Sequence, residues 1–309
     1  MKTIIVYHQV RQGVDCPDGI CAAWVAARFF GEVTLVGVTH QPDYANYELP
    51  FPVKGNRIVL VDFCYPSSVL ASLIQQATEV VIIDHHHTRM GDIGRFQKQI
   101  LGGYSAKDCG STFAWEYFFP GKPEPWFLLH VLRRDTGKDG YYDGETPESE
   151  AIATAMSHRR EGLIGSQAFP IFEKLLNENP QTLVGEGKAL LAERDHLVKE
   201  SLEAYSEQTL KLVTTDESYQ VPFLTIENAK AYKHISWVGT SLCQVYTAAP
   251  FVAIRTDSEP NKISLRSKSS SLVDCGEVAK TFGGGGHKNA AGFEKFIVFN
   301  PEGFFEVSD

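Results

Sequence analysis

Four short apolar runs near the start of the chain constrain the fold more than any other feature. Each is four or five residues long and rich in valine or isoleucine, and segments with the apolar spacing of helices lie between them. The runs are Thr3–Tyr7, Thr34–Val38, Ile58–Val61 and Glu79–Ile83, and the helical segments include Ile20–Phe30 and Ser67–Gln75. Buried strands that alternate with helices are typical of a parallel sheet covered on both faces. The sequence therefore predicts an α/β protein with an N-terminal parallel sheet.

A long charged segment indicates where two domains join. The 309 residues are enough for about two domains. Residues 181–212 are highly charged, with apolar positions such as Leu190 and Leu197 at helical spacing. Strand-like and helix-like patterns resume beyond it. We therefore expect an N-terminal domain over 1–180, a linker helix over 181–212 and a smaller α/β domain over 213–309.

Composition excludes several classes of protein. Hydrophobic residues make up 43% of the chain, too many for a disordered or fibrous protein. The 29 basic and 38 acidic residues give a net charge of −9, which argues against a broad surface for long nucleic acid. A short anionic substrate remains compatible with a local basic patch.

Targeting and redox signals point to the cytoplasm. No apolar run approaches the roughly 18 residues that a membrane span needs. The opening segment Met1–Tyr7 is too short for a signal peptide and is predicted to be a buried strand. The six cysteines form no C-x-x-C pair, so we expect reduced thiols in a cytoplasmic protein. Whether the chain forms a homodimer is left open by the sequence.

Histidines and aspartates follow three of the predicted strands. His8 comes directly after the first run, Asp62 follows Val61, and the run Asp84-His85-His86-His87 follows Ile83. Residues just past the carboxyl ends of parallel strands gather in one crevice. Carboxylates mixed with imidazoles suit Mn²⁺, Mg²⁺ or Zn²⁺, and a pair of such ions suits phosphoryl hydrolysis. The pattern therefore predicts a metal site, although each residue alone would more often be a turn former or a structural histidine.

Three further aspartates are ambiguous by themselves. Asp15 and Asp18 lie in the turn before the first helical segment, where Asp18 is also suited to capping a helix. Either could join the metal ligands opposite His8. Asp135 ends an apolar helical segment, where a surface ion pair is the simpler interpretation.

A glycine-rich segment near the C-terminus suggests a phosphate-binding loop. Gly283-Gly284-Gly285-Gly286 precedes His287 and Lys288 and is followed by Ala290-Ala291-Gly292. Glycines let the backbone approach an anion closely, and the small residues after them indicate tight packing behind the loop. Arg266, at the end of a predicted strand, could contact phosphate through two guanidinium nitrogens. The segment lacks the G-K-[ST] ending of a Walker A motif.

Two of these motifs together resemble the signatures of a known family, the DHH phosphoesterase superfamily. Asp84-His85-His86 is similar to its namesake motif, and Gly284-Gly285-Gly286-His287 with Ala290-Ala291-Gly292 is similar to the signature of its associated C-terminal domain. The resemblance spans nearly the whole chain. It implies a dinuclear Mn²⁺-type centre in the N-terminal domain, with Mg²⁺ or another divalent ion as alternatives.

The resemblance also implies a role for each matching residue. Asp62 would bridge the two metals and His85 would be a ligand. Asp84 would orient that ligand, and His86 would face the substrate phosphate. Asp135 would be the ligand of the fourth motif.

The first motif departs from the family pattern. His8 and the aspartates Asp15 and Asp18 resemble it, but Cys16 stands where the first of two closely spaced aspartates is usual. A shift by one residue would let Asp15 take that place. Otherwise Cys16 is a thiolate ligand, or the first metal position is weakened.

The resemblance implies that the C-terminal domain presents the substrate contacts. These would be Arg266, the glycines Gly284, Gly285 and Gly286, and His287. The expected chemistry is hydrolysis of a phosphate ester by metal-activated water, with Asp62, Asp84, His85 and His86 in the catalytic centre. A small nucleotide-type substrate is expected, such as a short oligonucleotide, a nucleoside bisphosphate or a cyclic dinucleotide. The alternatives are a polyphosphate or pyrophosphate hydrolase and a non-catalytic nucleotide-binding module.

Overall fold

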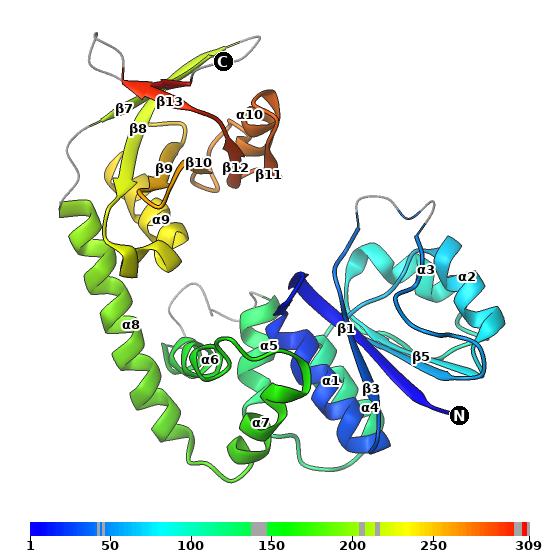
Figure 1. The fold of residues 1–309 in the computed structure, drawn as a ribbon. Coiled ribbons are helices and arrows are strands. Elements are labelled where there is room, and N and C mark those ends of the chain that lie inside the picture. Colours follow the sequence, from blue (N-terminus) through cyan, green and yellow to red (C-terminus); the bar gives the residue numbers. More distant parts are fainter. Residues whose placement is uncertain are drawn as a thin grey trace. The chain divides into compact units, whose positions relative to one another are not determined.

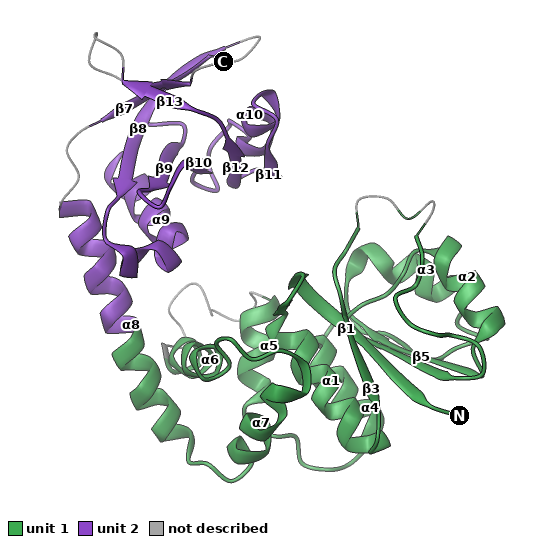
Figure 2. Cartoon of the chain, viewed as in Figure 1, with its two compact units in different colours: residues 1–190 green, residues 191–309 purple. Residues whose placement is uncertain are grey.

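The computed structural model divides the chain into two compact units, residues 1–190 and 191–309 (Figure 2). It describes residues 1–41, 44, 47–136, 147–203, 208–213, 217–299 and 305–307.

The first unit contains the predicted parallel sheet (Figure 1). Its strands are β1 (Thr3–Arg11), β2 (Val14–Asp15), β3 (Thr34–Val38), β4 (Arg57–Val61), β5 (Glu79–Asp84) and β6 (Leu101–Tyr104). The parallel order is β3-β1-β4-β5-β6, and the short β2 pairs antiparallel with β1. The four predicted strands are all present, so the expected α/β class is confirmed. The strand order reverses between β1 and β4, where chain segments leave the sheet in opposite directions.

Helices cover both faces of this sheet because successive strand residues point to opposite sides. The helices of this unit are α1 (Pro17–Phe30), α2 (Ser67–Gln76), α3 (Met90–Arg95), α4 (Gly110–Phe118), α5 (Leu128–Thr136), α6 (Pro147–Arg159) and α7 (Phe169–Leu175). Val59 and Val61 of β4 pack into the core shared with α1, α4 and α5. Ile58 and Leu60 enter the opposite core, which contains residues of α2 and α3. Alternation along each strand therefore fixes which end residues face the helices.

The second unit is a mixed sheet flanked by two helices. It begins within α8 (Pro180–Glu203). Its strands are β7 (Thr209–Val213), β8 (Ser218–Ile226), β9 (Val252–Thr256), β10 (Glu259–Arg266), β11 (Gly285–His287), β12 (Ala290–Glu294), β13 (Ile297–Phe299) and β14 (Phe305–Val307), and its other helices are α9 (Ile235–Val245) and α10 (Cys275–Thr281). The strand order is β11-β12-β10-β9-β8-β7-β14-β13. An α/β second unit is thus confirmed.

The linker helix is shorter than the predicted 181–212. Helix α8 ends at Glu203, and Thr209–Val213 form strand β7, paired antiparallel with β8. Residues 204–207, which the prediction also placed in the helix, lie outside the described part. Leu210 and Leu212 are two residues apart and both fully buried, which is the two-residue repeat of a strand. The charged residues around them made this repeat hard to recognise in the sequence. The division between the two units falls within α8. In the described part of the chain, no helix is both long and apolar enough to cross a membrane.

Candidate metal centre

The carboxyl ends of the parallel strands deliver most of the candidate ligands. His8 lies inside β1 and not after it as expected, because the strand continues to Arg11; it is the last β1 residue that pairs with β3. Asp62 follows β4 directly, and Asp84 is the last residue of β5, with His85 and His86 after it. Strands β1 and β4 flank the point where the strand order reverses. This is the place where ligands bind in open α/β sheets.

Three carboxylates surround one ring nitrogen of His85. Its Nε2 lies 3.1 Å from Asp62 Oδ1 and 3.3 Å from Asp135 Oδ2. Asp18 Oδ2 is 3.7 Å from the same nitrogen. Asp18 and Asp62 are each 1% exposed, so water screens their charges little. We call Asp18, Asp62, His85 and Asp135 the carboxylate cluster; they are four of the residues that the sequence suggested as ligands.

The pKa values of the carboxylate cluster record an excess of negative charge. Burial and repulsion by Asp62 and Asp135 raise the pKa of Asp18 well above its usual value. Burial alone would lower the pKa of His85, but its hydrogen bond with Asp62 and the nearby carboxylates raise it to about 9. Burial would likewise raise the pKa of Asp62, yet the neighbouring imidazoles of His8 and His85 hold it below its usual range. One imidazolium thus balances part of the carboxylate charge, and a divalent cation would balance more of it.

The N-terminus of α4 fixes Asp18. Its two carboxylate oxygens accept hydrogen bonds from the backbone N–H groups of Gly110, at 2.5 Å, and Ser111, at 2.9 Å. These N–H groups have no partners inside the helix, and the helix dipole favours a negative charge there. A Cβ on Gly110 would lie 2.6 Å from Asp62 Cβ, so glycine allows α4 to approach the cluster. Asp18 therefore both caps a helix of distant sequence and faces the cluster.

Asp62 has an unusual backbone conformation. Its φ is 52°, and it is the one non-glycine residue with positive φ among the described residues. Its N–H donates to the carbonyl of Ile83, 2.9 Å away. Aspartate tolerates this conformation better than most residues, but it still costs about 1–3 kcal/mol. Such strain persists where the surrounding structure fixes the residue, as at functional sites.

A second group of donors lies on the other side of Asp62. His8 Nδ1 and Asp62 Oδ2 are 3.5 Å apart, and both are buried without a hydrogen-bond partner among the described residues. Donor atoms of His8, Cys16 and Asp62 lie within 4.8 Å of one another. Buried polar atoms without partners are costly, and a cation between them would satisfy both. The residues present therefore fit a second cation that shares Asp62 with the carboxylate cluster.

Asp84 organises the two histidines that follow it. Its Oδ1 accepts hydrogen bonds from the backbone N–H of His85, at 2.8 Å, and from His86 Nδ1, at 2.7 Å. Burial would lower the pKa of His86, but the bond with Asp84 raises it. Asp84 is completely buried, so it acts on the site through the orientation of its neighbours.

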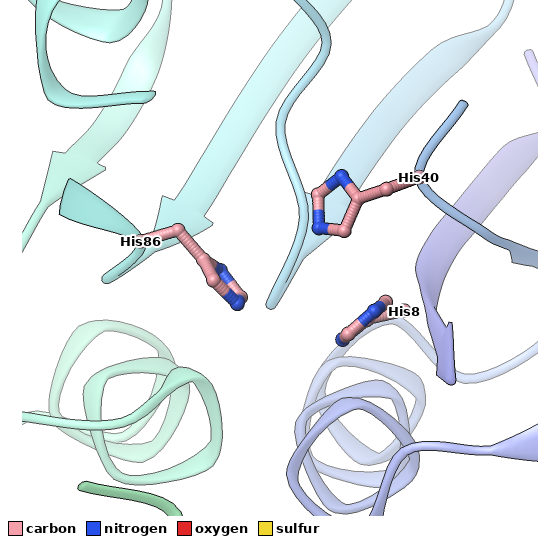
Figure 3. A group of neighbouring side chains, drawn as sticks. All are labelled: His8, His40 and His86. Atoms are coloured by element: carbon pink, nitrogen blue, oxygen red, sulfur yellow. The ribbon is translucent and has the colours of Figure 1, made fainter. Parts of the chain in front are cut away.

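The sequence interpretation missed His40. Its ring centroid lies 4.9 Å from that of His8 and 5.7 Å from that of His86, and the three rings turn toward a common space (Figure 3). Burial and the neighbouring His8 and His86 lower the pKa of His40 to about 4, so this imidazole is neutral at pH 7. The strand-end rule could have found it, because His40 follows the predicted strand Thr34–Val38 by two residues.

Asp15 does not lie in the cluster, contrary to one of the two expectations for the first motif. Its Oδ1 accepts hydrogen bonds from the Tyr7 hydroxyl, at 2.9 Å, and from Gln9 Nε2, at 2.7 Å. Its Oδ2 accepts one from the backbone N–H of Gly165, at 2.7 Å. The physical reason is strand β2, whose antiparallel pairing sets Asp15 opposite Gln9. Cys16, the next residue, takes the position near His8 and Asp62.

In the second unit, the expected phosphate-binding residues lie on neighbouring strands. Arg266 of β10 pairs with Ala290 of β12, which pairs in turn with His287 of β11. Residues directly opposite in a sheet share a face, so Arg266 and His287 lie on one face with the small Ala290 between them. The Arg266 guanidinium donates to Ser236 Oγ, at 2.9 Å, which fixes its direction.

The glycines of this segment serve packing within the hairpin. A side chain on Gly284 would collide with the carbonyl of Gly292, and one on Gly286 would meet Ala291. Gly286 also has a φ of 142°, which favours glycine. A Cβ on Gly283 or on Gly285 would meet no atom within 4 Å, so these two positions leave open space.

A cavity of about 300 Å³ adjoins the metal centre within the first unit. His8, Cys16, Asp18, His86 and Asp135 line it on the side of the centre. Its remaining lining includes the apolar Val131 and Met156, together with Ser157 and Arg160. Arg160 Nε is buried and has no hydrogen-bond partner among the described residues. This arginine was also missed, because nothing in its local sequence distinguishes it from the neighbouring Arg159.

Comparisons with known proteins find distant similarities. No protein-family model matches the sequence. An uncharacterised protein, R106, of Acanthamoeba polyphaga mimivirus is 23% identical over 304 residues, which cover 94% of this chain and 66% of that protein. The chain thus spans slightly less than two thirds of the length of this relative. Among solved structures, a pGpG-specific phosphodiesterase from Vibrio cholerae aligns over 95% of this chain and 92% of its own, with 13% identity and a TM-score of 0.49. An uncharacterised protein from Helicobacter pylori G27 aligns over 95% and 93%, with 13% identity and a TM-score of 0.36.

Proposed function

We propose that this chain is a metal-dependent phosphoesterase of the DHH type that hydrolyses a small nucleotide-type substrate. Under this proposal the first unit holds two divalent ions, for which Mn²⁺ is the leading candidate. The second unit, with Arg266 and His287, contributes contacts to the substrate phosphate.

The observation that carries the proposal is the environment of Asp62. Its Oδ1 faces His85 Nε2, and its Oδ2 faces the unpartnered His8 Nδ1. One buried carboxylate thus has a candidate cation position on each side. Asp18, His85 and Asp135 surround the first position, and His8 and Cys16 adjoin the second. A carboxylate shared between two cation positions is suited to phosphoryl transfer.

The chemistry divides between the cations and the chain. Divalent ions bound at these positions would make water a stronger acid and would balance negative charge on the phosphate. The chain orients the donors: α4 holds Asp18, and Asp84 holds the loop of His85 and His86. His86 lines the cavity, and its Nδ1 is engaged by Asp84, so Nε2 is the ring nitrogen left for another partner.

The cavity supports a small anionic substrate. Its volume of about 300 Å³ accommodates part of a nucleotide and not a folded polymer. Arg160 offers an unpartnered guanidinium nitrogen, and Val131 and Met156 offer an apolar wall. A phosphate next to the apolar face of a base matches this combination.

The test replaces Asp62 by asparagine, which has the same shape and tolerates positive φ. Hydrolysis of bis(p-nitrophenyl) phosphate with Mn²⁺ should fall by more than the roughly 10- to 100-fold that loss of a residue supporting a ligand costs. Elemental analysis should show loss of bound metal. Asp92→Asn is the matched control, because Asp92 binds Ser67 and Arg89 away from the site. A folded Asp62→Asn protein that keeps its turnover would refute the proposal.

A further inference from the structure

Three imidazoles from three separate strand ends meet beside the carboxylate cluster. His8 belongs to β1, His40 follows β3, and His86 follows β5. Each of the three offers a ring nitrogen, and these nitrogens lie within 4.8 Å of one another. The rings are tilted by 55° to 89° and do not stack face to face. This arrangement lets edges, where the nitrogens are, point to a common space (Figure 3).

The hydrogen bonds of these rings leave nitrogens unused. His8 Nδ1 is buried without a partner. The His40 ring has no hydrogen bond within the described part of the chain, and its ring contacts there are His8, His86 and Phe63. In contrast, His86 Nδ1 is fixed by Asp84. A carboxylate on one ring nitrogen of a histidine commonly orients the other nitrogen toward a metal.

We propose that His8, His40 and His86 form a nitrogen-rich site for a borderline divalent ion such as Zn²⁺ or Co²⁺. Imidazole suits these ions, whereas carboxylates suit Mg²⁺ and Mn²⁺. Two imidazole nitrogens on one tetrahedral ion lie about 3.3 Å apart, so the ring nitrogens need to approach one another by up to about 1.5 Å. The three imidazoles would supply three ligands, and Asp62, beside His8, would supply a fourth.

With this site, the two ions of the centre would have different kinds of ligand. The ion beside His8 would take nitrogen donors from His40 and His86, while the carboxylate cluster would hold a harder ion. His86 would then act on a phosphate through its ion and not by direct contact. The proposal concerns metal binding and does not require the proposed hydrolysis, although it places a second role on the same centre.

Metal binding tests the proposal without any substrate. The metal-free full chain is titrated with Co²⁺ and Zn²⁺, followed by elemental analysis and the visible spectrum of bound Co²⁺. His40→Ala should lose about one equivalent of Zn²⁺ and change the Co²⁺ spectrum. His87→Ala is the matched control, because His87 is an exposed neighbour outside the donor groups. His40→Cys should restore binding and add a thiolate-to-cobalt absorption band.

Two outcomes would overturn the proposal. One is a folded His40→Ala protein with wild-type Zn²⁺ stoichiometry, affinity and Co²⁺ spectrum. The other is a thiolate band in the wild type that Cys16→Ser removes and His40→Ala leaves unchanged, which would assign the ion beside His8 to Cys16. Circular dichroism confirms that each variant folds. Zn²⁺ bound through His40, together with no turnover of phosphate esters by the wild type in Mn²⁺, would refute the proposed function and leave this proposal standing.

Discussion

Asp62 shows how much of the site depends on one residue. It follows a fully buried strand, has a φ of 52° and is 1% exposed. Its two oxygens face different donor groups, so no other carboxylate in the described cluster could take its place. A strained backbone, a buried carboxylate and contacts on both sides occur together at Asp62, as expected where function overrides local conformational preference.

At the same scale, Asp15 and Asp135 should differ in their effect on metal binding. Asp15→Asn should leave the metal content unchanged, because Asp15 binds Tyr7, Gln9 and the Gly165 backbone. It should lower the free energy of unfolding by about 1–3 kcal/mol, since the amide cannot accept all three bonds. Asp135→Asn should reduce the metal content. Elemental analysis and urea unfolding check both variants, and metal loss in Asp15→Asn alone would contradict the assignment.

Sequence reasoning located several residues of this site for a physical reason. Parallel strands must end at one edge, so polar residues after Val61 and Ile83 had to lie close together. It could not separate Asp15 from Cys16, because that choice depends on the pairing of β2 with β1. It missed His40, although only Thr39 separates this residue from its strand, and the fold shows that its ring turns back toward His8.

At the scale of elements, helix α4 supports the centre with its N-terminus. The N–H groups of Gly110 and Ser111 bind Asp18, which is 92 residues earlier in the chain than Gly110. This contact joins α1 and α4, both of which pack on the same face of the sheet. The site therefore depends on how closely α4 approaches the strand ends.

Gly110→Ala should weaken this support. The added methyl group would lie 2.6 Å from Asp62 Cβ and 2.9 Å from Asp18 Oδ2, so α4 must shift. The free energy of unfolding should fall by about 1–3 kcal/mol, as in other overpacked sites, and metal affinity should fall with it. Gly94→Ala in α3 is the control, because its Cβ would meet no atom within 4 Å; it should stabilise by about 0.4–1 kcal/mol. Urea unfolding and metal titration distinguish the two, and equal stability would contradict the packing argument.

Sequence reasoning found the helices and strands whose apolar residues form a clear run or repeat. The four predicted strands of the first unit were found because short runs rich in valine and isoleucine leave few alternatives, although β3 is mostly only half-buried. Strand β6 was missed because Gly102 and Gly103 interrupt its pattern, and both have positive φ. The glycine-rich segment was expected to be a loop, yet Gly285–His287 form the edge strand β11. These residues form a strand because they pair with β12, and glycines by themselves carry no strand pattern.

For the whole molecule, stability should depend on pH through a histidine outside the metal centre. His130 of α5 is partly buried, with Nδ1 2.9 Å from Ser149 Oγ. Burial and the nearby Arg133 lower its pKa to about 4, below the ordinary value of 6.5. The unfolded chain therefore binds a proton more readily than the folded chain does. Neutral His130 therefore adds to the free energy of unfolding above about pH 6.5, relative to acid, and this addition is lost as the pH falls toward 4.

His130→Asn should remove this contribution, since asparagine can keep a bond with Ser149 but does not titrate. The free energy of unfolding should then fall less between pH 7 and pH 4.5 than in the wild type. His196→Asn is the control, because the side chain of His196 is 69% exposed. Urea unfolding at several pH values provides the measurement. A pH dependence identical to the wild type would show that His130 does not carry the effect.

The alternation of β4 between two cores has an evolutionary consequence. Adding or deleting one residue inside this strand would send Val59 and Ile58 to the wrong sides and would turn Asp62 away from its partners. Insertions and deletions should therefore be excluded from the strands and accumulate in the connections, so that homologues differ in length while the phase of each strand is inherited unchanged.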